Sequence, residues 1–158
     1  MPSLQELSDR WEINQRMIDY ATAVDTLQIE RLDQVFTPAA TIDYRECGVL
    51  ARSYPELRQF FIDDIPNNPR YSHILANADI LLAGDEATSR TYCFEPLEAT
   101  LADGTNQVMF LCWFYIDRHV RTPDGWRIAD RRVQRGLRYN VPKAVNDFLD
   151  SALPAAAG

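Results

Sequence analysis

Lysine is almost missing from this chain. Lys143 is the only lysine among 158 residues, and all other basic side chains are arginines. Acidic residues outnumber basic ones by 23 to 16, which gives a formal net charge of −7. This balance lacks the positive potential that draws proteins to nucleic acids or anionic membranes, so we expect neither partner. Six arginines crowd residues 121–138, but they alternate along a predicted strand, and we expect them to be solvated or ion-paired.

Histidine and cysteine are scarce as well. The chain has two histidines, His73 and His119, and three cysteines, Cys47, Cys93 and Cys112. They form no cluster with the ligand spacing of a zinc or non-haem iron site, so we expect no metal. Three cysteines at irregular spacing leave one without a partner, which favours reduced thiols in a cytoplasmic protein.

Several familiar signatures are absent. There is no glycine-rich phosphate loop and no G-x-S-x-G nucleophile elbow, so phosphate-loop binding and serine-nucleophile chemistry find less support. No apolar run approaches the roughly 20 residues of a membrane span. The N-terminal MPSLQELSDRW lacks the basic and apolar regions of a signal peptide. With 46% hydrophobic and 25% charged residues, the composition is that of one globular domain large enough for a core and a pocket.

The first half of the chain has mainly helical patterns. Ser3 followed by Glu6 is a capping-box pattern and predicts a helix from residue 4. A second short helix is predicted over 26–35, a strand over 39–45 and a third helix over 54–64. The apolar stripe of the first helix consists of Leu4, Leu7, Trp11, Ile18 and Ala21, widened by Ile13, Met17, Tyr20 and Val24.

The second half is β-like. Four long segments, 71–83, 86–100, 105–120 and 126–140, are separated by turn signals such as Gly84-Asp85 and Asp103-Gly104. Their connections are too short for parallel crossovers, so we expect an antiparallel meander. Such a sheet must curve to bury one face, and three helices could cover its concave side around a blind pocket. We expect one α+β domain over 1–141 and a loosely held tail over 142–158.

Asp25 interrupts the apolar stripe of the first helix. At about 100° per residue, it points close to the direction of Leu7, and Tyr20 lies at the edge of the apolar arc. Both face inward if the helix continues to residue 25, where a carboxylate would need a partner. Alternatively, the helix ends near Val24 and Asp25 caps the next helix. Geometry alone leaves both alternatives open.

His73 opens the first long strand, on the same, more polar face as Leu75, Asn77 and Asp79. A single histidine on a strand is more often structural or exposed than catalytic, and we expect His119, near a hairpin tip, to be solvated. A histidine paired with a buried aspartate is different. The carboxylate accepts a hydrogen bond from one ring nitrogen, fixes the tautomer and leaves the other nitrogen as a base for a proton next to a carbonyl.

These motifs resemble the SnoaL-like branch of the nuclear transport factor 2 superfamily over about residues 10–140. The matching features are the helix with Y-x4-D, the F-T-P-A-A-T-I-D-Y segment, the S-H pair that opens a long strand, and the D-G-W-R-I-x-x-R ending. The resemblance implies a cone-shaped α+β fold, in which a strongly curved, mostly antiparallel sheet wraps around three helices. It does not imply one activity, because the superfamily hosts dehydratases, isomerases, epoxide hydrolases, dioxygenase subunits and non-catalytic binders.

Within the superfamily, the spacing of Asp25 and His73 is similar to that in scytalone dehydratase, bile-acid 7α-dehydratase and hexachlorocyclohexane dehydrochlorinase. These are cofactor-free lyases with an Asp–His dyad. The resemblance implies that His73 is the base and that Asp25 orients it. Tyr20 matches the tyrosine of the bile-acid enzyme, and Tyr44 lies where scytalone dehydratase has a substrate-orienting tyrosine. The dehydrochlorinase has a lysine that this chain lacks, so dehalogenation is the less favoured chemistry.

Arg131 matches an arginine of the dehydrochlorinase and would stabilise negative charge or brace Asp25, with Arg135 as the alternative if a bulge shifts the register. Phe94, Trp113 and Tyr115 are candidates for the substrate-binding wall. The resemblance therefore implies a dehydratase for a hydrophobic, carbonyl-bearing small molecule, assembled as a homotrimer. The alternatives are an isomerase of the ketosteroid-isomerase kind, in which a carboxylate is the base, and a non-catalytic ligand-binding domain.

Overall fold

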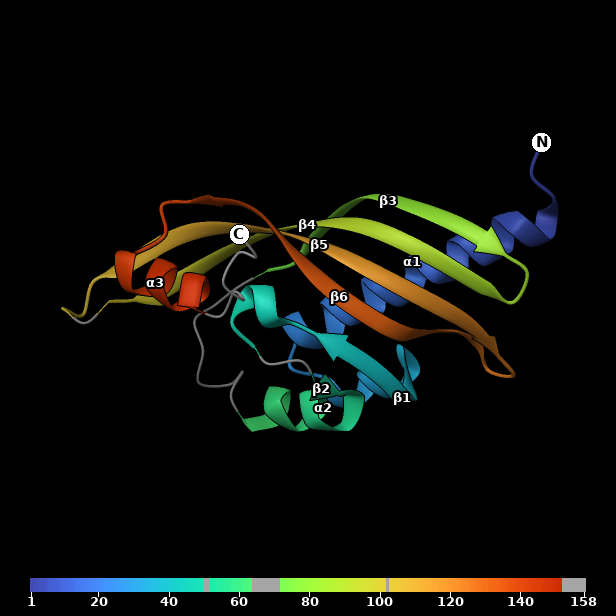
Figure 1. Cartoon of the computed structure of the whole chain (residues 1–158), viewed down its shortest axis with the longest axis horizontal. Helices are drawn as coiled ribbons and strands as arrows, with labels where there is room; N and C mark the ends of the chain where they lie inside the picture. The colour runs from blue at the N-terminus through green and yellow to red at the C-terminus, as the bar shows by residue number, and fades with distance from the viewer. Residues whose placement is uncertain (50–51, 64–71, 102, 152–158) are drawn as a thin grey trace, which may run out of the picture.

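The computed structural model describes residues 1–49, 52–63, 72–101 and 103–151 (Figure 1). Its helices are α1 (Leu4–Asp25), η1 (Ile29–Gln34), η2 (Arg45–Cys47), α2 (Tyr54–Asp63) and α3 (Lys143–Ser151). Its strands are β1 (Phe36–Asp43), β2 (Arg52–Ser53), β3 (Ile74–Ala83), β4 (Glu86–Thr100), β5 (Asn106–Thr122) and β6 (Gly125–Tyr139). No helix in these ranges is long and apolar enough to cross a membrane.

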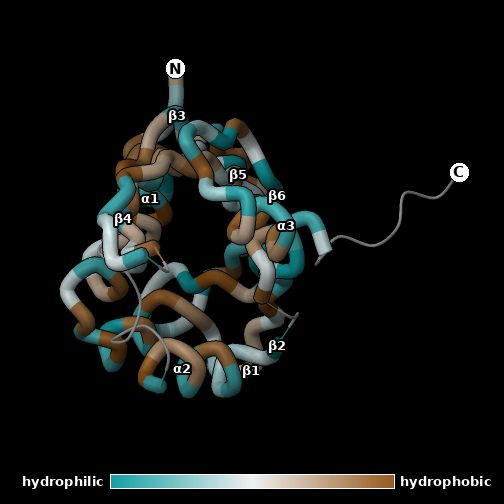
Figure 2. Tube along the Cα trace, turned by 90° about the vertical axis from the view of Figure 1, so that its left-hand side faces the viewer, coloured by the Kyte–Doolittle hydropathy of each residue, from teal (hydrophilic) through white to brown (hydrophobic). Residues whose placement is uncertain are grey.

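The six strands form one sheet in the order β2-β1-β6-β5-β4-β3. The strands β3 to β6 are the expected antiparallel meander, whereas β1 lies parallel to β6 and β2 pairs with β1. Seen along the long axis, the sheet curls around, and α1 and α2 complete the ring (Figure 2). The predicted α+β cone with a curved, mostly antiparallel sheet is confirmed.

The buried face of α1 differs from the predicted stripe. The residues that we took as its widened edge, Ile13, Met17, Tyr20 and Val24, are buried together with Ala21. The other members of the predicted stripe, Leu4, Leu7, Trp11 and Ile18, are exposed. The expectation was wrong because tertiary contacts choose between two adjacent apolar arcs, and the chosen arc begins at Asp9, a polar residue that hydropathy places outside.

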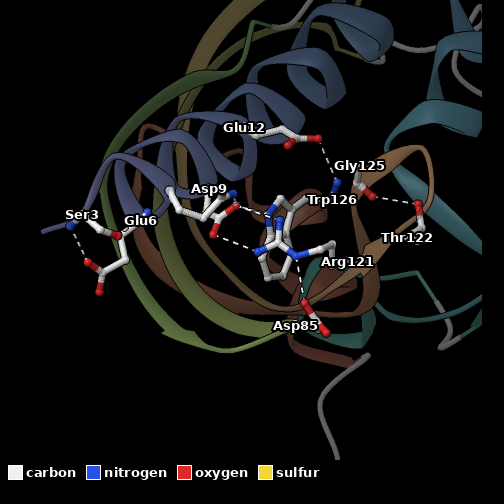
Figure 3. Close-up of polar contacts among 10 residues, drawn as sticks. Ser3, Glu6, Asp9, Glu12, Asp85, Arg121, Thr122, Gly125 and Trp126 are labelled. Carbon is white, nitrogen blue, oxygen red and sulfur yellow. Dashed lines mark hydrogen bonds and ion pairs between the residues drawn. The ribbon is translucent and has the colours of Figure 1, made fainter.

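Asp9 anchors the N-terminal half of α1 to the tip of the β5–β6 hairpin (Figure 3). Its carboxylate accepts two hydrogen bonds from the Arg121 guanidinium, at 2.8 Å each, and one from the indole Nε1 of Trp126 at 3.1 Å. Glu12 accepts from the backbone N–H of Trp126 at 2.9 Å. Trp126 is fully buried. The tryptophan of the D-G-W-R motif therefore closes one end of the cone and serves the fold rather than the chemistry.

The C-terminal end of α1 settles the position of Asp25. The N–H of Leu27 donates to the carbonyl of Val24, and the N–H of Gln28 donates to the carbonyl of Ala23, with Leu27 in the left-handed region at φ 58°. This is a Schellman motif, so Asp25 is the last helical residue. The alternative in which Asp25 caps the next helix was wrong. The predicted helix over 26–35 is the shorter 3₁₀ helix η1.

A bulge divides β3 into halves of opposite orientation. Ala76 pairs with Tyr92 but Asp79 pairs with Arg90, so β3 holds one extra residue, and Asn77 has φ 52°. A bulge shifts the alternation of side chains by one position. The single apolar face predicted for this strand was therefore wrong. Ile80 faces the core, whereas Ile74 is exposed.

His119 is buried, whereas we predicted that it would be solvated. None of its surface is exposed, and its Nε2 lies 2.8 Å from the hydroxyl of Ser89. Burial lowers the pKa of His119 from 6.5 to about 4, because the charged imidazolium is poorly solvated there. His119 is thus a neutral core residue at pH 7.

The segment after Pro142 begins with a packed helix rather than the loose tail that we expected. In α3, Leu149 is buried. The Arg135 guanidinium donates to the Leu149 carbonyl at 2.5 Å and to the Asp150 carboxylate at 2.8 Å. Helix α3 thereby lies beside the end of the sheet where the β4–β5 hairpin turns (Figure 1).

Candidate active site

A cavity of about 430 Å³ lies between α1, β4, β5, β6 and α3. Four of its polar side chains, Tyr20, Tyr44, His73 and Glu95, form what we call the polar end. From Glu95 the wall continues along β4 and β5 and onto α3 with apolar side chains only, including Leu97, Ala99, Met109, Val145, Phe148 and Leu149. The volume is that of a site for a small organic molecule.

Asp25 and His73 form the predicted pair. His73 Nδ1 lies 2.6 Å from Asp25 Oδ1, and the His73 backbone N–H donates to Asp25 Oδ2 at 2.9 Å. An ionised carboxylate only accepts hydrogen bonds, so the ring hydrogen is on Nδ1 and Nε2 has the lone pair. The side chain of His73 is 6% exposed. Asp25 is less buried than we expected, with 24% of its side chain exposed.

Glu95 is a member of the polar end that the sequence analysis missed. Its Oε1 lies 4.0 Å from His73 Nε2, and its Oε2 accepts a hydrogen bond from the Trp113 indole Nε1 at 2.5 Å. The imidazole therefore lies between two carboxylates. The alternation of β4 held a signal for Glu95. The residues that share its face are small or apolar: Ala87, Ser89, Thr91, Cys93 and Leu97. A single acid on such a face is a candidate functional residue.

Tyr20 and Tyr44 lie beside the dyad and are joined to each other. Their hydroxyl oxygens are 2.8 Å apart, and the Tyr20 ring meets the His73 ring edge-on at 5.8 Å between centroids. Burial raises the pKa of Tyr44 to about 12 and that of Tyr20 well above its ordinary value. Both phenols thus keep their protons at neutral pH and can donate hydrogen bonds.

Arg131, rather than Arg135, lies next to these tyrosines. Its guanidinium carbon is 4.2 Å from the centre of the Tyr20 ring and 4.4 Å from that of Tyr115. It forms a fully buried bidentate pair with Asp117, at 2.8 Å for both hydrogen bonds. Arg131 therefore braces Asp117. It does not brace Asp25, which we had considered as its partner. Arg135 instead holds α3 in place.

Two of the three predicted wall aromatics line the cavity. Trp113 and Tyr115 do, with Tyr115 buried and its pKa raised well above the ordinary value by desolvation. Phe94 does not, and that prediction was wrong. Its neighbours Cys93 and Glu95 face inward, so Phe94 points to the opposite face of the sheet, where it stacks on Phe110 with centroids 5.5 Å apart.

Other chemistry finds little support in the described ranges. They contain no group of three or more histidine, cysteine or acidic side chains that could hold a metal ion. Burial raises the pKa of the Cys93 thiol to about 12 and raises that of Cys47 as well. Neither cysteine is a thiolate at neutral pH, so neither is an activated nucleophile.

Comparisons with known proteins identify the family and the fold of this chain. A family model described as a SnoaL-like domain matches residues 5–132. An uncharacterised protein of Mycobacterium tuberculosis is 45% identical over 134 residues, which is 85% of this chain and 89% of that protein.

Two solved structures have the same fold. A candidate scytalone dehydratase of Novosphingobium aromaticivorans superposes with a TM-score of 0.73 at 19% identity, over 86% of this chain and 89% of that one. A hexachlorocyclohexane dehydrochlorinase of Novosphingobium barchaimii superposes with a TM-score of 0.74 at 17% identity, over 89% and 94% of the two chains. At these identities the two likenesses establish the fold alone.

Proposed function

Because this chain belongs to the SnoaL-like family, we propose that it is a cofactor-independent lyase that eliminates water from a hydrophobic, carbonyl-bearing small molecule. The observation that carries the proposal is the contact of 2.6 Å between His73 Nδ1 and Asp25 Oδ1, which places the His73 imidazole in the wall of a largely apolar cavity. The dehydratase and dehydrochlorinase names of the two similar structures support an elimination reaction.

In the first step, His73 Nε2 takes the proton from the carbon next to the substrate carbonyl. The electron pair of the broken C–H bond moves toward the carbonyl and gives an enolate. Asp25 keeps the imidazole in the tautomer that can accept this proton, and its negative charge stabilises the imidazolium that results.

The tyrosine pair is the proposed binding site for the carbonyl oxygen. One of the two hydroxyls donates to the other, which leaves one hydroxyl hydrogen for the substrate oxygen. Donors fixed in advance around a developing negative charge are among the strongest contributors to enzymatic rates. Arg131, whose guanidinium lies against the Tyr20 ring, adds positive charge behind this pair.

In the second step, the imidazolium returns its proton to the hydroxyl on the adjacent carbon. The enolate electrons form the carbon–carbon double bond, the C–O bond breaks with its electron pair on oxygen, and water leaves. His73 is then neutral again, so the cycle requires no cofactor. A lysine cannot assist, because the only one, Lys143, lies on α3 with 87% of its side chain exposed.

Solvent exchange tests the first step without knowledge of the natural substrate. The probe is 4-phenylbutan-2-one in D₂O, and NMR follows the loss of its α-protons. The second probe, 4-hydroxy-4-phenylbutan-2-one, reports the dehydration through the ultraviolet absorption of the enone. We expect wild-type protein to accelerate both reactions and His73→Ala to lose at least 100-fold, since general bases typically contribute about 10²–10⁴. His119→Gln is the matched control and should keep full activity.

The same experiment separates the alternatives. If His73→Ala exchanges α-protons at nearly the wild-type rate, the proton transfer belongs to a carboxylate, as in an isomerase. Glu95, which lines the cavity beside His73, is the candidate acid. Binding of 4-phenylbutan-2-one without any exchange would indicate a non-catalytic ligand-binding domain. Either result overturns the proposed lyase.

We also propose that the chain assembles as a homotrimer through the outer face of the sheet. That face carries a group of partly buried aromatic side chains: Tyr92, Phe94, Phe110 and Phe114. Sedimentation equilibrium measures the mass directly, and we expect Phe110→Arg to yield monomers. A monomeric wild-type protein at micromolar concentration would overturn this assembly.

A further inference from the structure

We propose that Glu95 makes the site selective for a hydroxyl leaving group over a halogen at the same position. This inference rests on the proposed elimination reaction and specifies its substrate class. It follows from the distance of 4.0 Å between the Glu95 carboxylate and His73 Nε2.

The spacing between His73 Nε2 and Glu95 Oε1 suits a bridging atom. At 4.0 Å the two atoms are too far apart for a direct hydrogen bond. An oxygen about 2.8 Å from each would contact both atoms at once. Once His73 is protonated, Nε2–H is a donor, whereas the Glu95 carboxylate is an acceptor. The bridging atom must therefore accept one hydrogen bond and donate another, as a hydroxyl group does.

Glu95 is held in the orientation that this role requires. Its Oε2 takes the Trp113 indole hydrogen at 2.5 Å, which directs Oε1 toward His73. Trp113 comes from the neighbouring strand, where it pairs with Cys93, two residues before Glu95. Only 15% of the Glu95 side chain is exposed, so a ligand that donates a hydrogen bond replaces solvation that the carboxylate has largely lost.

A halogen at the leaving position would meet the opposite situation. It has no hydrogen to donate, and its partial negative charge is repelled by the carboxylate. This repulsion is stronger in a poorly solvated cavity than in water. Sites that hydrogen-bond a hydroxyl discriminate strongly against analogues that lack it, because their own polar group is left unpaired.

The elimination balances without a proton transfer to Glu95. The imidazolium proton passes from Nε2 to the leaving oxygen, the C–O bond breaks with its electrons on that oxygen, and the hydrogen that points at Oε1 departs with the water. Glu95 therefore orients the leaving group and remains a carboxylate throughout.

A binding experiment with two unreactive ligands tests the selection. Cyclohexanol and chlorocyclohexane have the same ring and differ in the leaving position. NMR titration follows the Trp113 indole N–H, which reports directly on Glu95. We expect wild-type protein to bind cyclohexanol at least tenfold more tightly than chlorocyclohexane. Glu95→Gln should bring the ratio to within about threefold, because the amide can turn its NH₂ group toward the ligand. Glu98→Gln, on the opposite face of β4, is the control and should keep the wild-type ratio.

Equal affinities in the wild-type protein would overturn the inference, as would a preference for the alcohol that survives in Glu95→Gln. The absence of any Trp113 shift with either ligand would overturn it too. If Glu95→Gln does not fold, the wild-type protein still tests the inference, because equal affinities or an unshifted Trp113 N–H would overturn it. The titration is independent of turnover, so a clear preference for the alcohol in a protein that exchanges no α-protons would refute the proposed reaction and not the selectivity.

Discussion

The carboxylate of Asp25 holds His73 at two points, its backbone N–H at 2.9 Å and its ring Nδ1 at 2.6 Å. The two contacts join the last residue of α1 to the residue just before β3. They fix both the position of the imidazole and its tautomer. The helix terminus and the strand entry are thus part of the catalytic geometry that we propose.

Asp25→Asn should abolish the proposed base with little change in shape. An asparagine amide can donate to Nδ1, which would place the ring hydrogen on Nε2 and remove the lone pair that takes the proton. We expect the α-proton exchange of 4-phenylbutan-2-one to fall by roughly 10³-fold or more, by analogy with the tautomer effect in serine proteases. Far-ultraviolet circular dichroism checks the fold. A variant with more than a third of the wild-type exchange rate would refute the role of Asp25.

The pair formed by Arg131 and Asp117 makes a prediction about stability. Arg131→Met alone leaves Asp117 as an unpaired charge in the core and should cost about 3–5 kcal/mol in the free energy of unfolding. The double variant Arg131→Met/Asp117→Leu removes both charges and should recover most of that loss. Urea denaturation measures both values. A double variant as unstable as the single one contradicts this account.

The double variant also isolates the catalytic part of Arg131. If its positive charge supports the enolate, the restored protein should still exchange α-protons at least tenfold more slowly than wild type. Full recovery of exchange along with stability would show that Arg131 only supports the packing of Tyr20 and Tyr115.

His119 should make the protein sensitive to mild acid. Its pKa is 6.5 in an unfolded chain and about 4 when folded. Between these values the unfolded chain binds a proton that the folded protein does not, so stability falls as the pH drops from about 6.5 toward 4. This protonation lowers the free energy of unfolding by roughly 2–3 kcal/mol between pH 7 and about pH 4.5.

His119→Gln removes this titration while leaving a polar partner for Ser89. We expect the variant to lose less stability than wild type between the two pH values, by that same 2–3 kcal/mol. Urea denaturation at both values gives the difference, and carboxylates that titrate in both proteins cancel. Parallel losses in the two proteins would rule out His119 as the cause.

Arg135 should control the mobility of α3 and with it the apolar part of the cavity. Its guanidinium joins the Leu149 carbonyl and the Asp150 carboxylate to the Glu46 carbonyl on η2. Arg135→Gln should raise amide hydrogen exchange across residues 143–151 by about tenfold or more and leave the sheet protected. Arg138→Gln, which removes a single ion pair to Asp150, is the matched control. Unchanged protection of α3 in Arg135→Gln would contradict this role.

Much of the architecture could be predicted because its signals are local. The capping box at Ser3, the tight turns and the alternation of the long strands depend on neighbouring residues only. The choice between two apolar arcs on α1 depends on Asp9 meeting Arg121, 112 residues away, and no local pattern encodes it. The same holds for His119, whose burial depends on the strand beside it.

In the candidate site, too, some residues could be predicted from the sequence and others could not. Asp25 stood out because a carboxylate interrupts an apolar stripe, and resemblance supplied His73 as its partner. Phe94 was wrongly predicted to line the cavity and its neighbour Glu95 was missed, and both follow once the inward face of β4 is fixed. That face could have been read from the small and apolar residues that alternate with Phe94. Arg131 lies against the Tyr20 ring and Arg135 binds α3, but the carboxylate partner of Arg131 comes from β5, which the linear spacing does not reveal.

The bulge in β3 bears on how proteins of this kind could gain or lose activity. The extra residue around Asn77 lets His73 enter the cavity while Ile80, farther along the strand, still faces the core. Loss of one codon there would restore regular alternation, and the two ends of the strand could no longer both face inward. If the core end keeps its place, the histidine turns out of the cavity while the cone survives. A protein that binds a ligand and one that transforms it would then differ by a single in-frame deletion.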